Sequence, residues 1–474
     1  MTPRAKSEIS AGHLESVRAW YDAQPTKLTW ASVGYRAMLA HYYRILIPPD
    51  ASVLEIGCGT GELLARVTAR RRVGVDLSQK QIEAARVRAP DCEFLVQAGE
   101  TLELSERFDY ILLSDTLNFA ADVQQVFERL HAVSHPGTRL IVNYSSSLWR
   151  PVFALARGMG LKQGGPQSNW LTTADVQSLM GLADWSVVTK QPRILSPVRA
   201  LGIGDWINRW VAPLLPFFCI TVFCVARSTR RRETGPLTVS VVIPARNEAG
   251  NIEAAVLRTP DMGAGSELIF VEGHSKDNTW EEIERVAAKY PERRIKTLRQ
   301  PGKGKGDAVR AGFAAAEGDL FFILDADLTV PPEEMPKFYE AVTSGRAEFA
   351  NGSRLVYPME KAAMQFLNMC ANKTFGFLFT WMLGQRLKDT LCGTKVLRRA
   401  DYERIVANRA YFGDFDPFGD FDLLFGAAHL NMRIVDIPIR YRERTYGSTN
   451  IHRWRHGWLL LRMVLFAGRK LKFV

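Results

Sequence analysis

The chain contains two separate series of short apolar runs that alternate with amphipathic stretches. The first series spans residues 51–145, and the second starts at residue 238. Such alternation is typical of a parallel β-sheet with crossover helices, because parallel strands need a long connection between them. A basic, polar stretch at 229–237 separates the two series and ends in Gly-Pro-Leu. The sequence therefore predicts two α/β domains, residues 1–228 and 238–450, with this stretch as their linker.

The composition favours a folded chain with more than one core. Hydrophobic residues make up 47% and charged residues 23% of the 474 residues, and this length exceeds that of one ordinary domain. The six cysteines form no C-x-x-C pair and have no histidine at zinc-ligand spacing. The N-terminus carries no apolar run of the kind found in signal peptides. Together these features predict a cytoplasmic protein with reduced thiols.

One uncharged stretch, residues 210–226, approaches the length of a membrane span. Its 17 residues lie at the lower limit of about 17–25 residues for a transmembrane helix. Pro213 and Pro216 interrupt it, and its second half is rich in residues that favour strands. We expect the last strand of the first sheet here, with a membrane span as the alternative.

Positive charge is concentrated at the C-terminus. The net charge is +11, and residues 440–474 contain nine Lys or Arg and one acid, Glu443. Residues 451–474 mix these cations with Trp, Leu and Phe, which is typical of an amphipathic helix lying on an anionic membrane. We expect peripheral contact with the inner face of the cell membrane; packing of this helix on the protein core is the alternative. The sequence has no nucleic-acid-binding motif, so a nucleic-acid partner is not expected.

A glycine-rich loop follows the first predicted strand. Its three glycines stand at alternate positions: Gly57, Gly59 and Gly61. They allow a tight turn and a close approach of the backbone to a ligand. A dinucleotide fingerprint would have glycine at Glu62; the pattern here is E-x-G-x-G-x-G, beginning at Glu55. Asp76 ends the next strand, where an acid can accept hydrogen bonds from ribose hydroxyls.

This pattern resembles motif I of the class I methyltransferases, and the resemblance covers about residues 15–228. It implies a Rossmann-like domain that binds S-adenosylmethionine. In that family the glycines line the methionine part of the cofactor, Asp76 would hold the ribose, and Glu55 would order the loop. Methyl transfer needs mainly alignment of the acceptor with the sulfonium. The acceptor, whether a small molecule, a lipid or a glycan, stays open, and a regulatory or scaffold module that only binds the cofactor is the alternative.

The adenine side of this site departs from the family pattern. Many members carry an aspartate after the third strand, and that position is Ala98 here. We expect Gly99 and Glu100 to supply the adenine contact instead. Ser114, after the fourth strand, is expected to face the cofactor.

Two acids mark the second series. Asp325 and Asp327 end an apolar strand with Ala326 between them. Alternate residues of an extended chain point to the same side, so both carboxylates face one spot. Carboxylate oxygens suit Mg²⁺ or Mn²⁺, which can bridge a diphosphate and neutralise it as it leaves. A solvated acidic turn would be the other interpretation.

The surrounding motifs resemble those of family-2 glycosyltransferases with the GT-A fold. VSVVIPARNEAGNI is similar to the opening strand and loop of that family, and LIFVEGHSKDNTWE is similar to its V-D-D-x-S-x-D-x-T element with Glu272 in place of an aspartate. GKGKGDAVRAG matches a further glycine-rich stretch. The resemblance implies a UDP- or GDP-sugar donor and gives these donor-binding candidates: Pro244, Arg246, Glu248, Glu272, Asp277, Lys305 and Asp325.

The last motifs resemble dolichyl- and polyprenyl-phosphate sugar synthases. LKDTLCGTKVLRRADY keeps Asp389, Gly393 and Lys395 of the family stretch, although Leu391 replaces its usual glutamine. The resemblance implies an inverting transfer to a lipid phosphate. The phosphate-holding candidates are Lys395, Arg444 and Ser448. The catalytic candidates are Asp327, Asp420 and Asp422, either of the last two serving as a base if the acceptor is a glycan hydroxyl instead.

Overall fold

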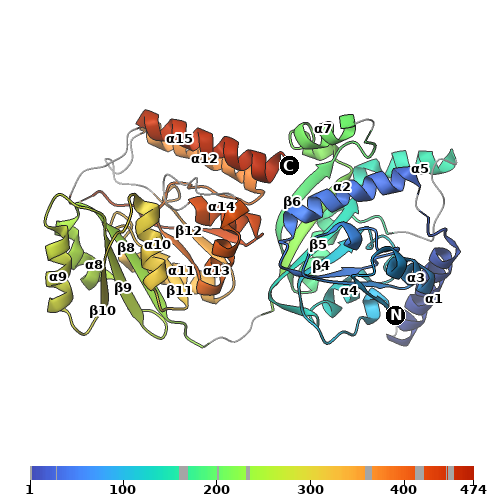
Figure 1. Cartoon of the computed structure of the whole chain (residues 1–474), viewed down its shortest axis with the longest axis horizontal. Coiled ribbons are helices and arrows are strands. Elements are labelled where there is room, and N and C mark those ends of the chain that lie inside the picture. Colours follow the sequence, from blue (N-terminus) through green and yellow to red (C-terminus); the bar gives the residue numbers. More distant parts are fainter. Residues whose placement is uncertain are drawn as a thin grey trace. The chain divides into compact units, whose positions relative to one another are not determined.

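The computed structural model describes residues 3–27, 29–159, 169–199, 202–230, 235–357, 366–411, 421–444, 446 and 453–474. The chain divides into two compact units, Met1–Arg230 with Phe473–Val474 and Arg231–Lys472 (Figure 1). Each unit is built on one seven-stranded sheet. The prediction of two consecutive α/β folds is therefore confirmed. Within the described ranges, no helix combines the length and the apolar character needed to cross a bilayer.

The sheet of the first unit has the order β3-β2-β1-β4-β5-β7-β6. Its strands are β1 (Ser52–Ile56), β2 (Arg71–Asp76), β3 (Glu93–Val96), β4 (Phe108–Ser114), β5 (Ser134–Ser145), β6 (Trp185–Ile194) and β7 (Thr221–Ser228). Strand β7 runs antiparallel to both neighbours, and the other pairs are parallel. The chain order reverses between β1 and β4, and ligands of such sheets bind outside the carboxyl ends of the strands at that point.

Helices cover both faces of this sheet. They are α1 (Pro3–Ala23), α2 (Trp30–Leu46), α3 (Gln79–Arg88), α4 (Val123–Arg129), α5 (Arg150–Gly158), α6 (Thr173–Leu182) and α7 (Ile203–Trp210). Apolar residues of α2 and α3 belong to one core cluster, and those of α4 and α6 belong to the other. The stretch 210–226 contains the end of α7, a 3₁₀ turn at Pro216–Phe218 and most of β7. It therefore supplies the strand that we expected there.

The sheet of the second unit has the order β10-β9-β8-β11-β13-β12-β14. Its strands are β8 (Val239–Ala245), β9 (Ser266–Glu272), β10 (Arg294–Arg299), β11 (Leu320–Ile323), β12 (Phe349–Ser353), β13 (Lys395–Arg398) and β14 (Ile434–Pro438). Strand β13 is antiparallel to β11 and β12. The order reverses between β8 and β11, so a second ligand crevice is expected where these two parallel strands end.

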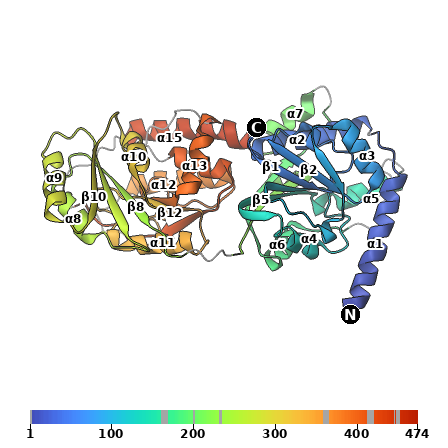
Figure 2. The ribbon, with the colours of Figure 1, turned by 60° about the horizontal axis from the view of Figure 1, so that its bottom comes forward.

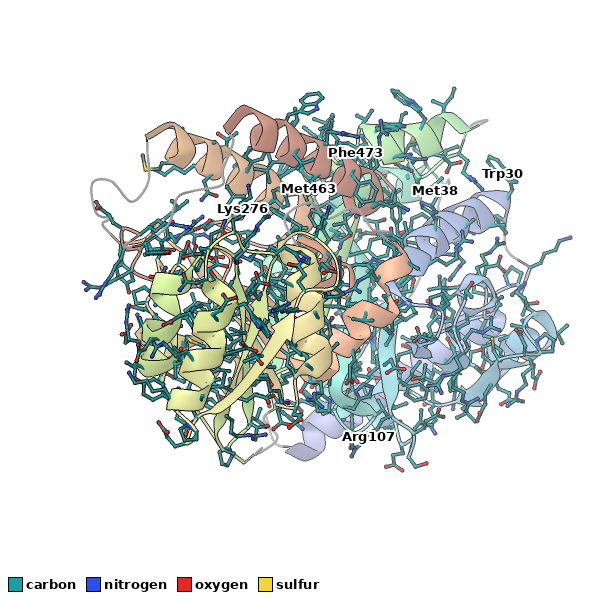
Figure 3. The ribbon with its side chains drawn as sticks, turned by 60° about the vertical axis from the view of Figure 1, so that its left-hand side comes forward. Trp30, Met38, Arg107, Lys276, Met463 and Phe473 are labelled. Carbon is teal, nitrogen blue, oxygen red and sulfur yellow. The ribbon has the colours of Figure 1, made fainter. Side chains whose placement is uncertain are left out.

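The helices of the second unit are α8 (Ile252–Arg258), α9 (Thr279–Lys289), α10 (Lys305–Ala315), α11 (Met335–Thr343), α12 (Phe366–Leu383), α13 (Arg399–Ala407), α14 (Phe421–His429) and α15 (Arg453–Ala467). Helices α12 and α15 lie side by side in Figures 1 and 2. Met463, on the core-facing side of α15 in Figure 3, is fully buried, whereas Trp458 and Leu465 are 63% and 58% exposed. The C-terminal helix thus packs on the core and also presents an apolar stripe to solvent.

Candidate active sites

The glycine loop of the first unit is shaped by positions that a side chain would disrupt. Gly57, Gly59 and Gly61 have φ values of 70°, 53° and 69°, in the left-handed region that glycine enters most easily. A Cβ at Gly57 would stand 2.7 Å from the Thr116 side chain, and one at Gly61 would stand 2.9 Å from the Phe94 ring. A Cβ at Gly59 would meet nothing within 4 Å. Backbone at Gly59 therefore faces open space, where a ligand can approach it.

Asp76 ends β2 and holds this loop. Its Oδ2 accepts a hydrogen bond of 2.8 Å from the Gly59 amide, and its Oδ1 accepts one of 2.9 Å from the Ser78 amide. Burial raises the pKa of Asp76, and the two amides oppose that shift. A carboxylate has about four acceptor sites, so two are left for a diol. The arrangement fits the ribose role that the resemblance implies.

Glu55, at the end of β1, is buried without a partner. Among the described residues, neither carboxylate oxygen accepts a hydrogen bond of normal geometry. Burial raises the pKa of Glu55 to about 8; the charge of Arg36 opposes this shift, and the nearby Asp76 adds to it. A buried carboxylate without a partner is rare in folded proteins and is typical of a site that receives a ligand. The ammonium group of S-adenosylmethionine could supply the cationic hydrogen-bond donor that Glu55 lacks. Glu55, Asp76 and the glycine loop therefore fit that cofactor.

The sequence did not reveal the part that the N-terminal helices play in this site. Tyr21, near the end of α1, has its pKa raised by burial and by Asp76. The Tyr21 carbonyl accepts a hydrogen bond of 3.1 Å from Gln81 Nε2 at the start of α3, which fastens α1 beside the Asp76 strand. Arg36 on α2 acts electrostatically on both Glu55 and Asp76. The one sequence signal for this role was the presence of aromatic residues in the segment before residue 51, which carries no recognisable motif.

The loop after β4 carries the remaining predicted residues. Ser114 is buried at the strand end, and Asp115 follows it with φ 56°, a conformation uncommon outside glycine. Asn143 Nδ2 donates to Asp115 Oδ1 at 3.0 Å. Glu100 is buried and accepts a hydrogen bond of 2.8 Å from the Ala121 amide. Its carboxylate therefore fastens the loop after β4, and the adenine contact expected of Gly99 and Glu100 stays a prediction.

In the second unit, each of the two paired acids meets a cation. Lys305 Nζ, at the start of α10, lies 2.5 Å from Asp325 Oδ1. Arg444 Nη2 lies 2.5 Å from Asp327 Oδ2, and Nη1 of the same arginine lies 2.8 Å from Glu248 Oε1. Burial would raise the pKa of Asp325, but Lys305 and more distant cations lower it. Of the predicted residues, Lys305, Arg444 and Glu248 thus lie together with Asp325 and Asp327 at the end of β11.

Gly393 leaves the space for this cluster. A Cβ there would collide with Oδ2 of Asp325 and Nζ of Lys305. Gly250 makes similar room for Tyr446, since its Cβ would stand 2.6 Å from that ring. The segment around Arg444 is therefore packed on the loop that follows β8. These close approaches explain why two glycines far apart in the chain border one site.

The other predicted donor-binding residues lie in and directly after β8 and β9. The Glu272 carboxylate accepts a hydrogen bond of 2.5 Å from the Ser275 amide, and Asp277 accepts one of 3.2 Å from the Thr279 amide. Asn247 has φ 58° and accepts a hydrogen bond from the Lys276 amide at 2.7 Å. Lys276 is labelled in this loop in Figure 3. Pro244 lies in β8 and the exposed Arg246 directly follows it.

Asp389 and Lys395 are buried supports behind the paired acids. Arg354 holds Asp389 through two contacts of 2.7 and 2.8 Å, and Asn372 adds a hydrogen bond of 2.8 Å. Although burial opposes it, Arg354 lowers the pKa of Asp389 to about 2. Lys395 Nζ donates to the Cys392 carbonyl at 2.5 Å and to Asn351 Oδ1 at 3.2 Å. The sequence did not single out Arg354, because its partner lies 35 residues away.

Asp422, at the start of α14, lies between two arginines. Arg409 and Arg310 approach its Oδ2 at 3.4 and 3.9 Å. These two distances are those of ion pairs, so the geometry agrees with a charge-pairing role for Asp422. Asp420 and Ser448 lie outside the described residues.

Comparison with known proteins agrees with both folds. Residues 47–169 match the model of a methyltransferase domain, and residues 240–406 match the model of glycosyl transferase family 2. A dolichol-phosphate mannosyltransferase of Pyrococcus furiosus is 29% identical over 221 residues, which are 45% of this chain and 59% of that protein. An undecaprenyl-phosphate 4-deoxy-4-formamido-L-arabinose transferase of Edwardsiella ictaluri is 37% identical over 217 residues, 44% of this chain and 62% of that protein.

A solved structure of magnesium protoporphyrin IX methyltransferase from Synechocystis PCC 6803 covers 48% of this chain and 98% of its own, with 18% identity and a TM-score of 0.31. The chain spans about three-fifths of the length of the two curated relatives named above. It combines a methyltransferase domain with a family-2 glycosyltransferase domain.

Proposed function

We propose that the second domain transfers a sugar from a nucleotide-sugar donor to a lipid phosphate such as a polyprenyl phosphate, with a divalent metal at Asp325 and Asp327. The observation that carries this proposal is the pair of carboxylates at the end of β11, each held by a cation. Carboxylates attract a metal ion, and lysine and arginine bind phosphate oxygens. The cluster therefore offers carboxylates for the metal ion and cationic side chains for the diphosphate.

The donor set suits Mg²⁺ or Mn²⁺. Among the described residues, no group of three or more His, Cys, Asp and Glu is placed to hold a metal. Mg²⁺ is commonly held by one or two carboxylates together with substrate phosphates, so two aspartates suffice when the donor supplies the rest. When bound, the metal would stabilise the charge on the departing nucleoside diphosphate.

The chain's own residues supply binding and charge stabilisation. Lys305 and Arg444, which contact Asp325 and Asp327, would bind the oxygens of the donor diphosphate. Glu272 and Asp277 border the nucleoside side. Direct attack by the acceptor on the anomeric carbon, opposite the leaving diphosphate, inverts the configuration there. No protein nucleophile is needed.

A phosphate acceptor agrees with the state of Asp422. A phosphate monoester is largely ionised at neutral pH, so it needs no strong general base. Asp422 is already engaged by Arg310 and Arg409, as expected of an acid that pairs with cations rather than serving as the base. The printed names of the two curated relatives also refer to dolichol phosphate and undecaprenyl phosphate. A glycan hydroxyl acceptor is the second candidate.

The test is a transfer assay on the full chain with UDP- and GDP-sugars, Mn²⁺, and either undecaprenyl phosphate or a free glycan as the acceptor. We expect sugar transfer to the lipid phosphate, its loss in EDTA and its return with added metal. With that acceptor, Asp422→Asn should keep an appreciable rate. A loss of about 10²–10⁴-fold, with donor binding unchanged, would indicate general-base catalysis and a hydroxyl acceptor.

For the first domain, we propose binding of S-adenosylmethionine and methyl transfer to an acceptor. Glu55 without a partner, Asp76 with acceptor sites to spare and the open face of Gly59 support this. Transfer of labelled methyl groups to extracts of lipids, glycans or small molecules separates an enzyme from a regulatory module. Calorimetric binding of the cofactor without any methyl transfer would favour the regulatory module.

We also propose that α15 docks the second domain on an anionic membrane. Its exposed stripe consists of Trp458, Leu461 and Leu465, next to the exposed Arg462. Tryptophan favours the membrane interface, and each Lys or Arg near anionic lipid contributes about 1 kcal/mol. Flotation of the full chain with anionic vesicles should be lost in Leu461→Ser/Leu465→Ser and weakened by salt. Equal flotation of that variant would remove α15 from the membrane contact.

A further inference from the structure

Helix α5 exposes an apolar stripe that the core does not use. Leu148, Val152, Leu155 and Met159 are 42%, 50%, 64% and 58% exposed. Val152 and Leu155 lie in α5, Leu148 lies in the 3₁₀ turn Ser147–Trp149 just before it, and Met159 directly follows it. Their spacing of four, three and four residues is that of one helical face, and the Met159 amide still donates to the Leu155 carbonyl at 3.0 Å. Soluble proteins seldom leave such a continuous apolar face open without a partner for it.

Helix α7 and the turn after it expose a second apolar surface. Ile203 and Trp206, one helical turn apart, are 61% and 59% exposed. In the following segment Leu214, Phe217 and Phe218 are 62%, 71% and 50% exposed. Trp206, Phe217 and Phe218 therefore make this second surface largely aromatic, and it is formed by α7 and the turn that follows it.

The two surfaces adjoin each other at one edge of the sheet. Trp149 Nε1 donates a hydrogen bond of 3.1 Å to the Phe218 carbonyl, which ties the start of α5 to the turn before β7. Ser145, at the carboxyl end of β5, pairs with Thr221 at the start of β7. Both helices lie at the upper end of the first unit in Figure 1. This is also the carboxyl edge of β1, where the glycine loop begins.

The charge of this combined surface is positive. In residues 146–159 and 202–218 the sequence holds three arginines and one acid, Asp205. Asp205 is neutralised by Arg199 at 2.8 Å, while Arg150 and Arg209 are exposed beside the apolar stripes. Apolar and aromatic side chains flanked by arginine suit the interface of an anionic bilayer, where tryptophan and basic groups both gain free energy.

We propose that the methyltransferase domain has its own membrane-docking surface, made by α5, α7 and the turn at Pro216–Phe218, and that its methyl acceptor is carried by a lipid. The second part rests on the proposed function of this domain. A bilayer contacting this surface lies next to the edge where the cofactor loop sits, so an acceptor with a lipid tail can reach the methyl group without leaving the membrane. A soluble acceptor would gain nothing from such a surface.

The experiment uses the full chain with Leu461→Ser/Leu465→Ser already introduced, which removes the contribution proposed for α15. Into this background we place Trp206→Ser/Phe217→Ser, or the control Leu182→Ser. Leu182 is 65% exposed at the end of α6, next to the start of β6 and thus at the opposite edge of the same sheet. Binding is measured by co-sedimentation with vesicles of phosphatidylcholine alone or with 30% phosphatidylglycerol (a mixing ratio chosen on the order of natural anionic content).

We expect the background protein to bind anionic vesicles, the double variant to bind at least about 10-fold more weakly, and the control to bind unchanged; a 10-fold loss corresponds to about 1.4 kcal/mol. Calorimetric titration with S-adenosylmethionine should give the same affinity in all three, which shows that the unit is folded. Equal vesicle binding by the double variant and the control overturns the docking surface. So does light scattering that shows a dimer lost in the double variant, because the surface then serves a second copy.

The acceptor is tested separately, with labelled S-adenosylmethionine and either vesicles of total lipid extract or the soluble extract. Label in the lipid phase that falls in the double variant supports the proposal. Label only in the soluble extract overturns the lipid acceptor. Absence of label everywhere, with vesicle binding intact, refutes the methyl-transfer function while the docking surface stands.

Discussion

The two candidate sites hold their carboxylates in opposite ways. In the first unit, Glu55 is buried without a hydrogen-bond partner among the described residues, and its pKa rises to about 8. In the second unit, Lys305 and Arg444 contact Asp325 and Asp327 directly, and the pKa of Asp325 is lowered. Both sites lie at the carboxyl edge of a doubly wound sheet where the strand order reverses. The shared position therefore does not determine the electrostatics of the site.

The difference follows from what each site has to receive. A carboxylate without a partner is costly in a folded protein, and a ligand that brings an ammonium group relieves that cost. Carboxylates that already contact cations keep their charge, and such carboxylates would be able to hold the proposed metal ion. On the functions proposed above, the first site would receive a cationic ligand, and the second would receive a metal ion with an anionic ligand.

The sharpest test of this comparison is Asp325→Asn. This change removes one charge from the proposed metal site without changing the size of the side chain, and we expect sugar transfer to fall by at least about 10³-fold, as for loss of a main electrostatic contributor. Mn²⁺ binding in the presence of nucleoside diphosphate, followed by electron paramagnetic resonance, should be lost with it. S-adenosylmethionine affinity serves as the control and should not change. Full turnover by this variant would disprove the metal assignment.

A second test concerns the buried ion pair behind that site. Asp389→Asn leaves Arg354 buried without its counter-charge, and removing one partner of a buried pair typically costs about 3–5 kcal/mol. Calorimetry should show a lower Tm for one of two unfolding transitions; the other is the one that S-adenosylmethionine shifts upward. The matched control is Glu333→Gln, whose pair with Arg258 is exposed and worth about 0–1 kcal/mol. Equal shifts of Tm in both variants would show that the buried pair of Asp389 and Arg354 stabilises the fold no more than an exposed pair does.

Local patterns were enough to predict both folds and the tight glycine loop of the first unit. The alternation of apolar runs gave two α/β units, and the uncharged stretch 210–226 was assigned to a last strand, β7, because Pro213 and Pro216 interrupt it. Gly57, Gly59 and Gly61 adopt the positive φ values that a tight loop requires. These predictions depend on residues close in sequence, where spacing carries the information.

Partners that are distant in sequence could not be predicted. Tyr21 and Arg36 reach the first site from helices that had no motif, and Arg354 meets Asp389 from a strand end 35 residues away. The role of Glu100 also depends on a remote contact, with the Ala121 amide. Spacing alone does not encode which side chain fills a buried pocket, because that depends on how helices pack on the sheet.

The third test examines the hydrogen bonds of the first site. Asp76→Ala removes a carboxylate that fastens Gly59 and is proposed to hold the ribose. Hydrogen bonds to charged groups are worth about 1.5–3 kcal/mol, so calorimetric titration should show S-adenosylmethionine affinity weakened by about 10–150-fold. Sugar transfer by the second domain should be intact. An unchanged cofactor affinity would exclude Asp76 from the site.

The smallest expected effect is a proton that Glu55 releases when the cofactor binds. The pKa of Glu55 is about 8 in the folded protein, and its ordinary value of 4.5 applies to the unfolded chain. Between pH 4.5 and pH 8 the folded chain therefore holds a proton on Glu55 that the unfolded chain has lost. Stability is therefore full below pH 4.5 and declines as pH rises through this window, by up to about 1.4 kcal/mol per pH unit. An ammonium group beside Glu55 favours its ionised form and expels the proton.

Titration of S-adenosylmethionine at pH 7, in two buffers with different ionisation enthalpies, measures that proton directly. We expect the wild type to release close to one proton per cofactor bound, since a group with a pKa near 8 is mostly protonated at pH 7. Glu55→Gln keeps the shape of the side chain but cannot titrate, so it should release none and should lose the decline in stability between pH 5 and 8. Equal proton release by both proteins would place the cofactor's ammonium group away from Glu55. The comparison of the two units would then fail, because it contrasts the Glu55 carboxylate, which has no partner until a ligand binds, with the carboxylates of Asp325 and Asp327, which already contact cations.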